Sequence, residues 1–185
     1  GSDAEILLTE IDSGAGWVSS SLSLGDSTVF KSVLNYVLNY YKAEKNILFI
    51  KDNRLSDYEK IINDGSYNLS LYDLADVLNE VSSYTGDTLA IIGLDLPNQL
   101  MIEKAYSLLN YTDYYIANFD TLTVSDINYG WQYDSIISSV ISSANASGSA
   151  LSSQILNGFS AYYPNNNLAA VIDMSKITAL NTAIN

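Results

Sequence analysis

Two polar segments of this chain carry residues that could do chemistry. Asp12-Ser13-Gly14-Ala15-Gly16-Trp17 follows the apolar residues 5–11, and Asp95-Leu96-Pro97-Asn98-Gln99-Leu100 follows the apolar residues 88–94. Their carboxylates could act as acids or bases or bind a basic group, and Ser13 offers a hydroxyl. The sequence contains no cysteine and no histidine. This removes thiolate nucleophiles, imidazole bases and Cys/His metal sites, so any chemistry must come from carboxylates, hydroxyls, lysines or the backbone.

Three carboxylates, those of Asp12, Asp95 and Asp126, are the candidates for an acidic binding cleft. A carboxylate pair suited to glycoside cleavage would need Asp12 and Asp95 about 5 to 9 Å apart, a separation that adjacent strands would allow. Asp95 could instead cap the helix that follows it, since a helix N-terminus favours an anion. A Ser–Lys arrangement at Ser13 is disfavoured, because neither polar segment contains a basic residue.

A further cluster of oxygen ligands, Asp52, Asn53, Asp57 and Glu59, could hold calcium. Its spacing does not fit the EF-hand loop, so a solvated acidic loop is the favoured interpretation. We therefore expect no metal and no cofactor, with calcium as the weaker alternative.

Charge and composition limit the kinds of partner that this chain can bind. The 185 residues include 8 basic and 21 acidic ones, for a formal net charge of −13. Such a chain has little with which to neutralise phosphates, so we expect no nucleic acid partner. No apolar run reaches the roughly 18 residues of a membrane span. Gly1-Ser2 resembles a cloning remnant, and residues 3–185 are expected to form one domain, either complete or as part of a longer chain.

Short apolar runs alternate with amphipathic stretches. Strands are predicted at residues 5–11, 46–50, 88–94, 114–119 and 168–173, and helices at residues 29–41, 71–81, 102–109, 136–141, 151–159 and 175–183. Ser70 and Asp73 form a variant of the capping box before the second helix, and residues 51–68 are interpreted as a polar connection. This alternation predicts an α/β fold with a mostly parallel sheet and helices on both faces.

Four short segments, in this order, resemble motifs of the clostripain family of cysteine peptidases, relatives of caspases and gingipains. Asp12, Gly14, Gly16 and Trp17 match D-H-G-x-G-W, and Asp95, Glu103, Ala105 and Tyr106 match D-A-C-L-M-x-x-x-E-x-A-Y. Residues 130–134 match G-W-x-Y-D, and residues 171–175 are similar to the later I-D-L-S. The resemblance implies a caspase-like three-layer sandwich. Family members also begin with a strand ending in D-N-N-L, which has no counterpart before residue 5, so edge strands could be missing.

The same resemblance places the two catalytic positions of the family on residues that cannot perform the catalytic roles. The histidine falls on Ser13 and the cysteine on Pro97. A thiolate and an activating imidazole are both needed for this chemistry. The resemblance therefore implies a pseudopeptidase that is not an enzyme. The abundance of Ser, Asn, Thr and Tyr, with 15 tyrosines, suits a protein that is secreted or displayed at the cell surface. It would bind a protein or peptide partner through the vestigial cleft of Asp12, Asp95 and Asp126, or serve as a structural module of a larger surface protein.

The alternative is a hydrolase that uses a carboxylate pair in place of the lost dyad. Three further residues are given structural roles. Glu103 is expected to be a buried hydrogen-bonding residue, and Trp17 and Trp131 are expected to pack in the core.

Overall fold

The computed structural model describes residues 23–51, 59–64, 66–86, 88–119, 131–143, 145–162 and 169–184. The elements, in chain order, are α2 (Ser27–Tyr40), β1 (Ile47–Lys51), β2 (Lys60–Asp64), β3 (Tyr67–Ser70), α3 (Leu71–Thr85), β4 (Leu89–Asp95), α4 (Ile102–Ser107), β5 (Thr112–Asn118), α5 (Tyr133–Ser142), α6 (Gly148–Tyr162), β6 (Ala169–Asp173) and α7 (Met174–Ile184). The strand predicted at residues 5–11 lies outside the described residues.

The described strands form a central sheet of four strands in the order β1-β4-β5-β6. β1, β4 and β5 run parallel to one another, whereas β6 pairs antiparallel with β5, with Tyr114 opposite Asp173. All seven residues of β4 are buried, as expected for an inner parallel strand that is covered on both faces. The predicted α/β fold with a mostly parallel sheet is confirmed.

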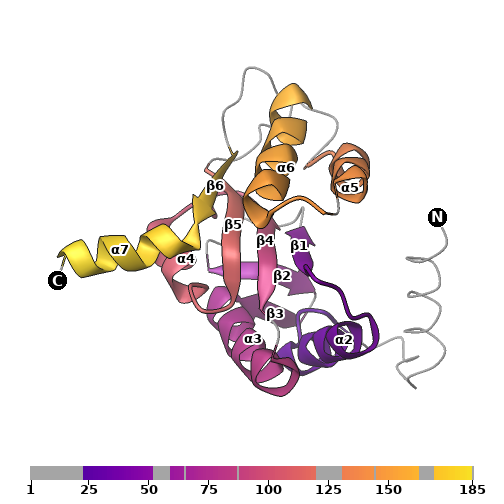
Figure 1. The fold of residues 1–185 in the computed structure, drawn as a ribbon. Helices are drawn as coiled ribbons and strands as arrows, with labels where there is room; N and C mark the ends of the chain where they lie inside the picture. The colour runs from indigo at the N-terminus through magenta and orange to yellow at the C-terminus, as the bar shows by residue number, and fades with distance from the viewer. Residues whose placement is uncertain are drawn as a thin grey trace.

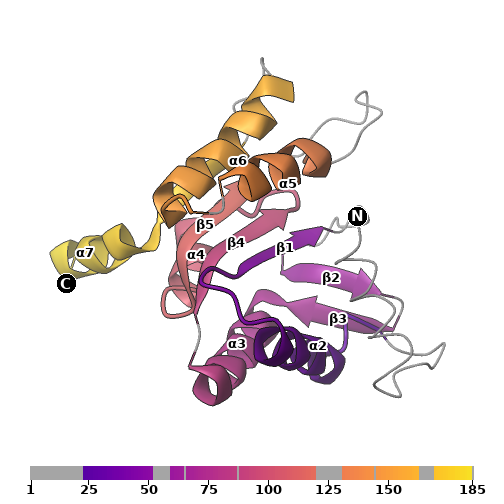
Figure 2. The same ribbon diagram turned by 45° about the vertical axis from the view of Figure 1, so that its right-hand side comes forward.

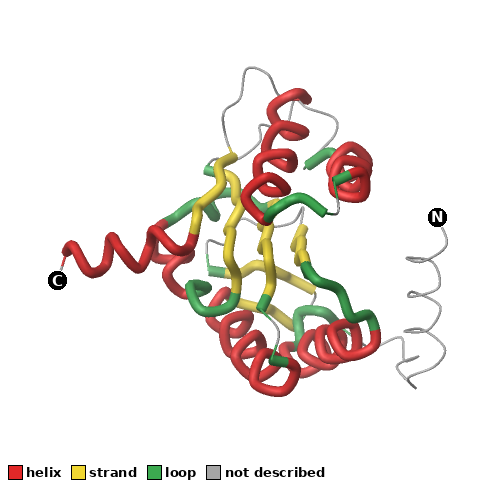
Figure 3. Tube along the Cα trace, viewed as in Figure 1, coloured by secondary structure: helices red, strands yellow, loops and turns green. Residues whose placement is uncertain are grey.

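Helices cover both faces of this sheet (Figure 1). On one face, α2, α3, α4 and α7 share a buried apolar cluster with Ile92 and Leu94 of β4. On the other, α5 and α6 pack with Trp131 against Ile91 of β4 and Ile116 of β5. Neighbouring residues of β4 thus serve opposite layers, because side chains alternate along a strand. The strands lie between the two groups of helices (Figure 3).

Helix α3 shows why the amphipathic prediction succeeded. The Ser70 hydroxyl accepts a hydrogen bond from the Asp73 N–H at 3.1 Å, and the Asp73 carboxylate accepts one from the Ser70 N–H at 2.8 Å. This reciprocal capping box satisfies two backbone donors at the helix start. The predicted apolar stripe is entirely buried: Leu71, Leu74, Val77, Leu78 and Val81. Gly86 ends the helix with a left-handed φ of 71°, a conformation that glycine adopts without penalty.

A two-stranded antiparallel hairpin, β2–β3, occupies part of the segment interpreted as a polar connection. That interpretation is wrong for residues 60–64, which form β2, and for residues 67 and 68, with which β3 begins. The hairpin places Ile61 and Leu69, both fully buried, into the core on the α3 side of the sheet. So few apolar residues in a polar stretch leave only a weak alternating pattern, which is why the strands were missed.

Two helices bury only some of the apolar residues from which they were predicted. In α4, Ala105 is buried as expected, but Ile102 and Tyr106 are exposed and the charged Lys104 is buried. In α5, only Ile136 is buried, while Ile137 and Ile141 are exposed. The last helix, α7, runs outward from the body of the protein (Figures 1 and 2). None of the helices in the described ranges combines the length and apolar character that crossing a bilayer requires.

Candidate functional site

Three parallel strands end side by side and define one edge of the sheet, which we call the carboxyl edge. β1 ends at Lys51, β4 at Asp95 and β5 at Asn118, and Lys51 stands opposite Asp95 in the register of β1 and β4. In open parallel sheets, ligands bind beyond the carboxyl ends of the strands. The candidate site is therefore built around these three residues.

Asp95 is the buried acid of this edge, with 5% of its surface exposed. Its Oδ2 atom accepts hydrogen bonds from the Trp131 N–H at 2.8 Å and the Tyr133 hydroxyl at 3.1 Å. Burial raises the pKa of Asp95, and the bonds from Trp131 and Tyr133, the charge of Lys51 and the Asn118 side chain oppose that rise. The carboxylate thus anchors the segment that leads into α5. It does not cap the helix after it, since α4 has no side-chain cap.

Trp131 is held from two strands at once. Besides its backbone bond to Asp95, its indole Nε1–H donates to Asn118 Oδ1 at 2.9 Å. Its ring is 3% exposed and meets Phe49 of β1 edge-to-face, with centroids 5.7 Å apart. The space for both rings comes from Gly93, where a Cβ would lie 2.4 Å from Phe49 and 2.8 Å from Trp131. The prediction that Trp131 packs in the core is confirmed.

Tyr133 links the basic and acidic residues of the edge. Lys51 Nζ lies 5.4 Å from the centroid of the Tyr133 ring, within range of a cation–π interaction. Burial, the Asp95 charge and the hydrogen bond to Asp95 all raise the pKa of Tyr133. The phenol therefore stays protonated at neutral pH and acts as a donor to Asp95.

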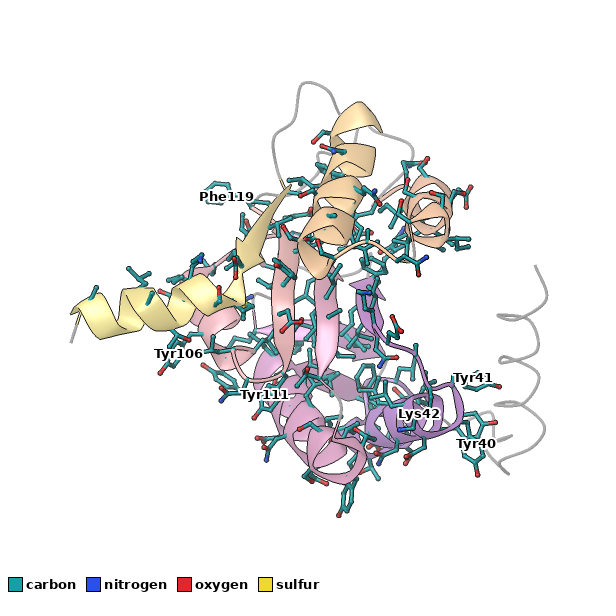
Figure 4. All side chains as sticks on the ribbon, viewed as in Figure 1. Tyr40, Tyr41, Lys42, Tyr106, Tyr111 and Phe119 are labelled. Atoms are coloured by element: carbon teal, nitrogen blue, oxygen red, sulfur yellow. The ribbon has the colours of Figure 1, made fainter. Side chains whose placement is uncertain are left out.

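The segment after β4 is fixed by β5. The N–H groups of Gln99 and Leu100 both donate to the Asn118 carbonyl, at 3.0 and 2.8 Å. Asn98 adopts a left-handed φ of 54°, a conformation that Asn tolerates better than most residues. Pro97 is half-buried and Asn98 is exposed. Beside them, at the end of β5, Phe119 is 67% exposed and projects from the ribbon (Figure 4).

Of the predicted cleft residues, only Asp95 lies within the described part of the chain. Asp12, Asp126, Ser13 and Trp17 lie outside it, so the acidic cleft and the Ser13 position stay predictions. The carboxylate pair of Asp12 and Asp95 likewise stays a prediction.

Glu103, expected to be buried, is exposed. Its neighbour Lys104 is the buried residue, 5% exposed, and burial lowers the pKa of Lys104 to about 8. The prediction for Glu103 is wrong because α4 is only six residues long. So short a helix shows too few apolar positions for its phase to be inferred.

Among the residues that were predicted as calcium ligands, the structure describes Glu59 alone. Asp52, Asn53 and Asp57 lie outside the described residues, and among those described no three His, Cys, Asp or Glu side chains gather as a metal site would require. Calcium binding stays a prediction. A separate cavity of about 450 Å³, lined in part by Asp113, Tyr114 and Asp173, lies where β5 begins and β6 ends, away from Asp95.

Sequence reasoning missed Lys51, Asn118 and Tyr133 as members of the site. The resemblance at residues 130–134 was the available signal for Tyr133, but it gave the tyrosine no role. Lys51 and Asn118 end strands whose pairing with β4 only the sheet reveals.

Comparisons with known proteins show which family and which solved structures this chain is similar to. A family model described as the clostripain family matches residues 11–185. A secreted cysteine protease from Bacteroides thetaiotaomicron, "iotapain", superposes with a TM-score of 0.62 at 21% identity, covering 85% of this chain and 47% of that one. A secreted cysteine protease from the same organism in complex with an irreversible peptide inhibitor gives a TM-score of 0.65 at 18% identity, with the same coverage. An inactive zymogen protease from Parabacteroides distasonis gives 0.63 at 17% identity, covering 88% of this chain and 43% of that one.

This chain thus spans about half the length of the solved structures it matches. No curated protein matches it. The comparisons overturn the prediction that the domain is not an enzyme, because the matched family and its solved relatives are cysteine proteases. The chain itself contains no cysteine.

Proposed function

Because this chain belongs to the clostripain family, we propose that it binds a peptide segment of a protein partner along the carboxyl edge of its sheet. The observation that carries this proposal is the assembly of Asp95, Trp131 and Tyr133. Its hydrogen bonds join the ends of β4 and β5, and the Tyr133 ring contacts Lys51 at the end of β1. A relative of the same fold is described in complex with a peptide inhibitor, which supports a peptide as the ligand class.

These 185 residues cannot supply the Cys–His dyad of the family, because they include neither cysteine nor histidine. By resemblance, Pro97 stands where the family has its nucleophile, and proline has no group that could attack a carbonyl. A thiolate and an imidazole would have to come from outside this sequence. We therefore propose that these residues recognise polypeptide without themselves supplying the dyad.

The proposed setting is extracellular, in solution or at a cell surface. Support comes from a relative that is described as secreted.

The carboxylate-pair hydrolase is not proposed. In the described part of the chain, the strands that flank β4 end in Lys51 and Asn118 rather than in a second carboxylate. The raised pKa of Asp95 has a structural cause, its burial.

Binding to a labelled library of unstructured decapeptides, followed by fluorescence anisotropy, tests this function. Two variants of exposed residues at the carboxyl edge, Phe119→Ala and Lys51→Ala, should weaken binding of the selected peptides by about tenfold, equal to about 1.4 kcal/mol. Tyr106→Ala is the matched control, since Tyr106 is 52% exposed on the outer face of α4 (Figure 4). Equal effects of all three variants, or no binder in the library, would overturn the proposal. Mass spectrometry of the same mixtures separates binding from cleavage.

A further inference from the structure

A buried pair of polar side chains, Gln99 and Lys104, joins the segment that follows β4 to helix α4. Gln99 is 1% exposed and Lys104 is 5% exposed. Lys104 Nζ donates to Gln99 Oε1 at 2.6 Å, and Gln99 Nε2 donates to the Pro97 carbonyl at 3.0 Å. The lysine is thus connected, through one side chain, to the backbone of Pro97.

The main chain of Gln99 is held by hydrogen bonds to β5. The Tyr115 hydroxyl, fully buried, donates to the Gln99 carbonyl at 2.7 Å, and the Gln99 N–H donates to the Asn118 carbonyl. The Asn118 side chain in turn accepts the hydrogen bond of the Trp131 indole. One continuous network therefore runs from Lys104 to the residues that form the carboxyl edge.

A buried lysine is energetically unfavourable at a position where the side chain only fills space. Burial of an ammonium group costs free energy unless the group is hydrogen-bonded, and here burial lowers the pKa of Lys104 to about 8. An apolar residue would fill the same volume without that cost. The motif that residues 95–106 resemble has methionine at the column of Gln99, so the polar pair is a property of this chain.

We propose that Lys104 is a positioning residue, which fixes residues 96–100 at the carboxyl edge through its hydrogen bond to Gln99. The segment so positioned includes the two residues that reach the surface there, Pro97 and Asn98. The inference that Lys104 assists partner binding rests on the proposed function. The inference that Lys104 orders residues 96–100 is independent of it.

Hydrogen exchange of the Gln99 and Leu100 amides tests the ordering directly. Lys104→Met leaves the buried Gln99 Oε1 without its donor, and an unsatisfied buried acceptor destabilises its surroundings. Exchange at these two amides should accelerate by about tenfold or more, while exchange within α3 stays unchanged. Lys104→Arg, which keeps a donor, should restore part of the protection.

The double variant Gln99→Met/Lys104→Met provides the stronger test. Replacing both partners by apolar groups of similar length can be nearly neutral, so the double variant should exchange more slowly at Leu100 than Lys104→Met alone. A mere packing role for Lys104 predicts additive losses instead. That result, or unchanged exchange in Lys104→Met, would overturn the proposal. If Lys104→Met fails to fold, the comparison of wild type, Lys104→Arg and the double variant still decides it.

Peptide affinity, measured with the library binders, should follow the exchange rates across the same variants. Absence of any peptide binder would refute the proposed function and leave the exchange result standing. Altered exchange with unaltered affinity would refute the binding role of Lys104 alone.

Discussion

Substitution of Gly93 by alanine tests how the candidate site is built. Gly93 lies in the fully buried strand β4, two residues before Asp95. An added Cβ would lie 2.4 and 2.6 Å from two ring atoms of Phe49 and 2.8 Å from Trp131 Cζ3. Trp131 cannot move away without straining its hydrogen bonds to Asp95 and Asn118. The strain should therefore appear at Phe49 and at the site itself.

The expected loss of stability follows from two opposing effects. Overpacking of a well-packed core costs about 1 to 3 kcal/mol, and the short contacts at Gly93 favour the upper part of that range. Alanine regains about 0.5 to 1 kcal/mol, because glycine loses more backbone entropy on folding. The free energy of unfolding should fall by about 2 kcal/mol. With a urea m-value of about 2 kcal/mol/M, the midpoint should fall by about 1 M.

Urea denaturation, followed by far-UV circular dichroism, measures this change, and Gly158→Ala is the matched control. Gly158 lies within α6, where an added Cβ would meet Ile136 Cγ1 at an ordinary 3.7 Å. The same chemical change should there raise stability by about 0.5 to 1 kcal/mol. In a Phe49→Ala background, the penalty of Gly93→Ala should shrink by at least about 1 kcal/mol, since two of its three close contacts are gone.

An unchanged midpoint for Gly93→Ala would refute the packing described around Trp131. So would additive effects of Gly93→Ala and Phe49→Ala, because they would show that the two residues do not compete for the same space.

Two further predictions concern the α3 cap and the charge of Asp95. Ser70→Ala removes the hydrogen bond that the Ser70 hydroxyl accepts from the Asp73 N–H. This change should cost about 1 kcal/mol of stability, or about 2 to 4 °C in thermal midpoint, whereas Ser83→Ala, at an exposed position of α3, should change neither. For Asp95, burial raises the pKa of the carboxyl group in the folded state. The folded state therefore favours the protonated carboxyl group. The stability that this group contributes is fully present below the ordinary Asp pKa of about 3.9 and is lost as the pH rises through the raised pKa. The difference in unfolding free energy between wild type and Asp95→Asn should therefore fall with pH across that window in urea titrations, and a flat difference would contradict the burial of the charge.

Local patterns were sufficient to predict most of the described elements. The apolar stripe of α3 and the capping box at Ser70 and Asp73 are properties of adjacent turns, and the all-apolar β4 can only be covered on both faces. The hairpin of β2 and β3 was missed because Ile61 and Leu69 become core residues only through their pairing and packing, which no local pattern shows.

The composition of the site was partly predictable. Asp95 follows the most apolar strand of the chain, and the carboxyl end of such a strand is where a functional group is expected. Residues 130–134 were singled out by resemblance. The two were not connected, since the hydrogen bond between Asp95 and Trp131 joins residues 36 positions apart.

By itself, the sequence determined which chemistry is absent, because residue types do not depend on folding: 185 residues without cysteine or histidine supply no thiolate and no imidazole. It also determined the alternation of strands and helices, since hydrophobic periodicity is local. Only the tertiary structure decided that β1 and β5 are the strands beside β4, that Asp95 is buried against Trp131 and Tyr133, and that Lys104 rather than Glu103 faces inward. Each of these depends on contacts between segments far apart in the chain, and the burial that sets their energies exists only once those segments have packed together.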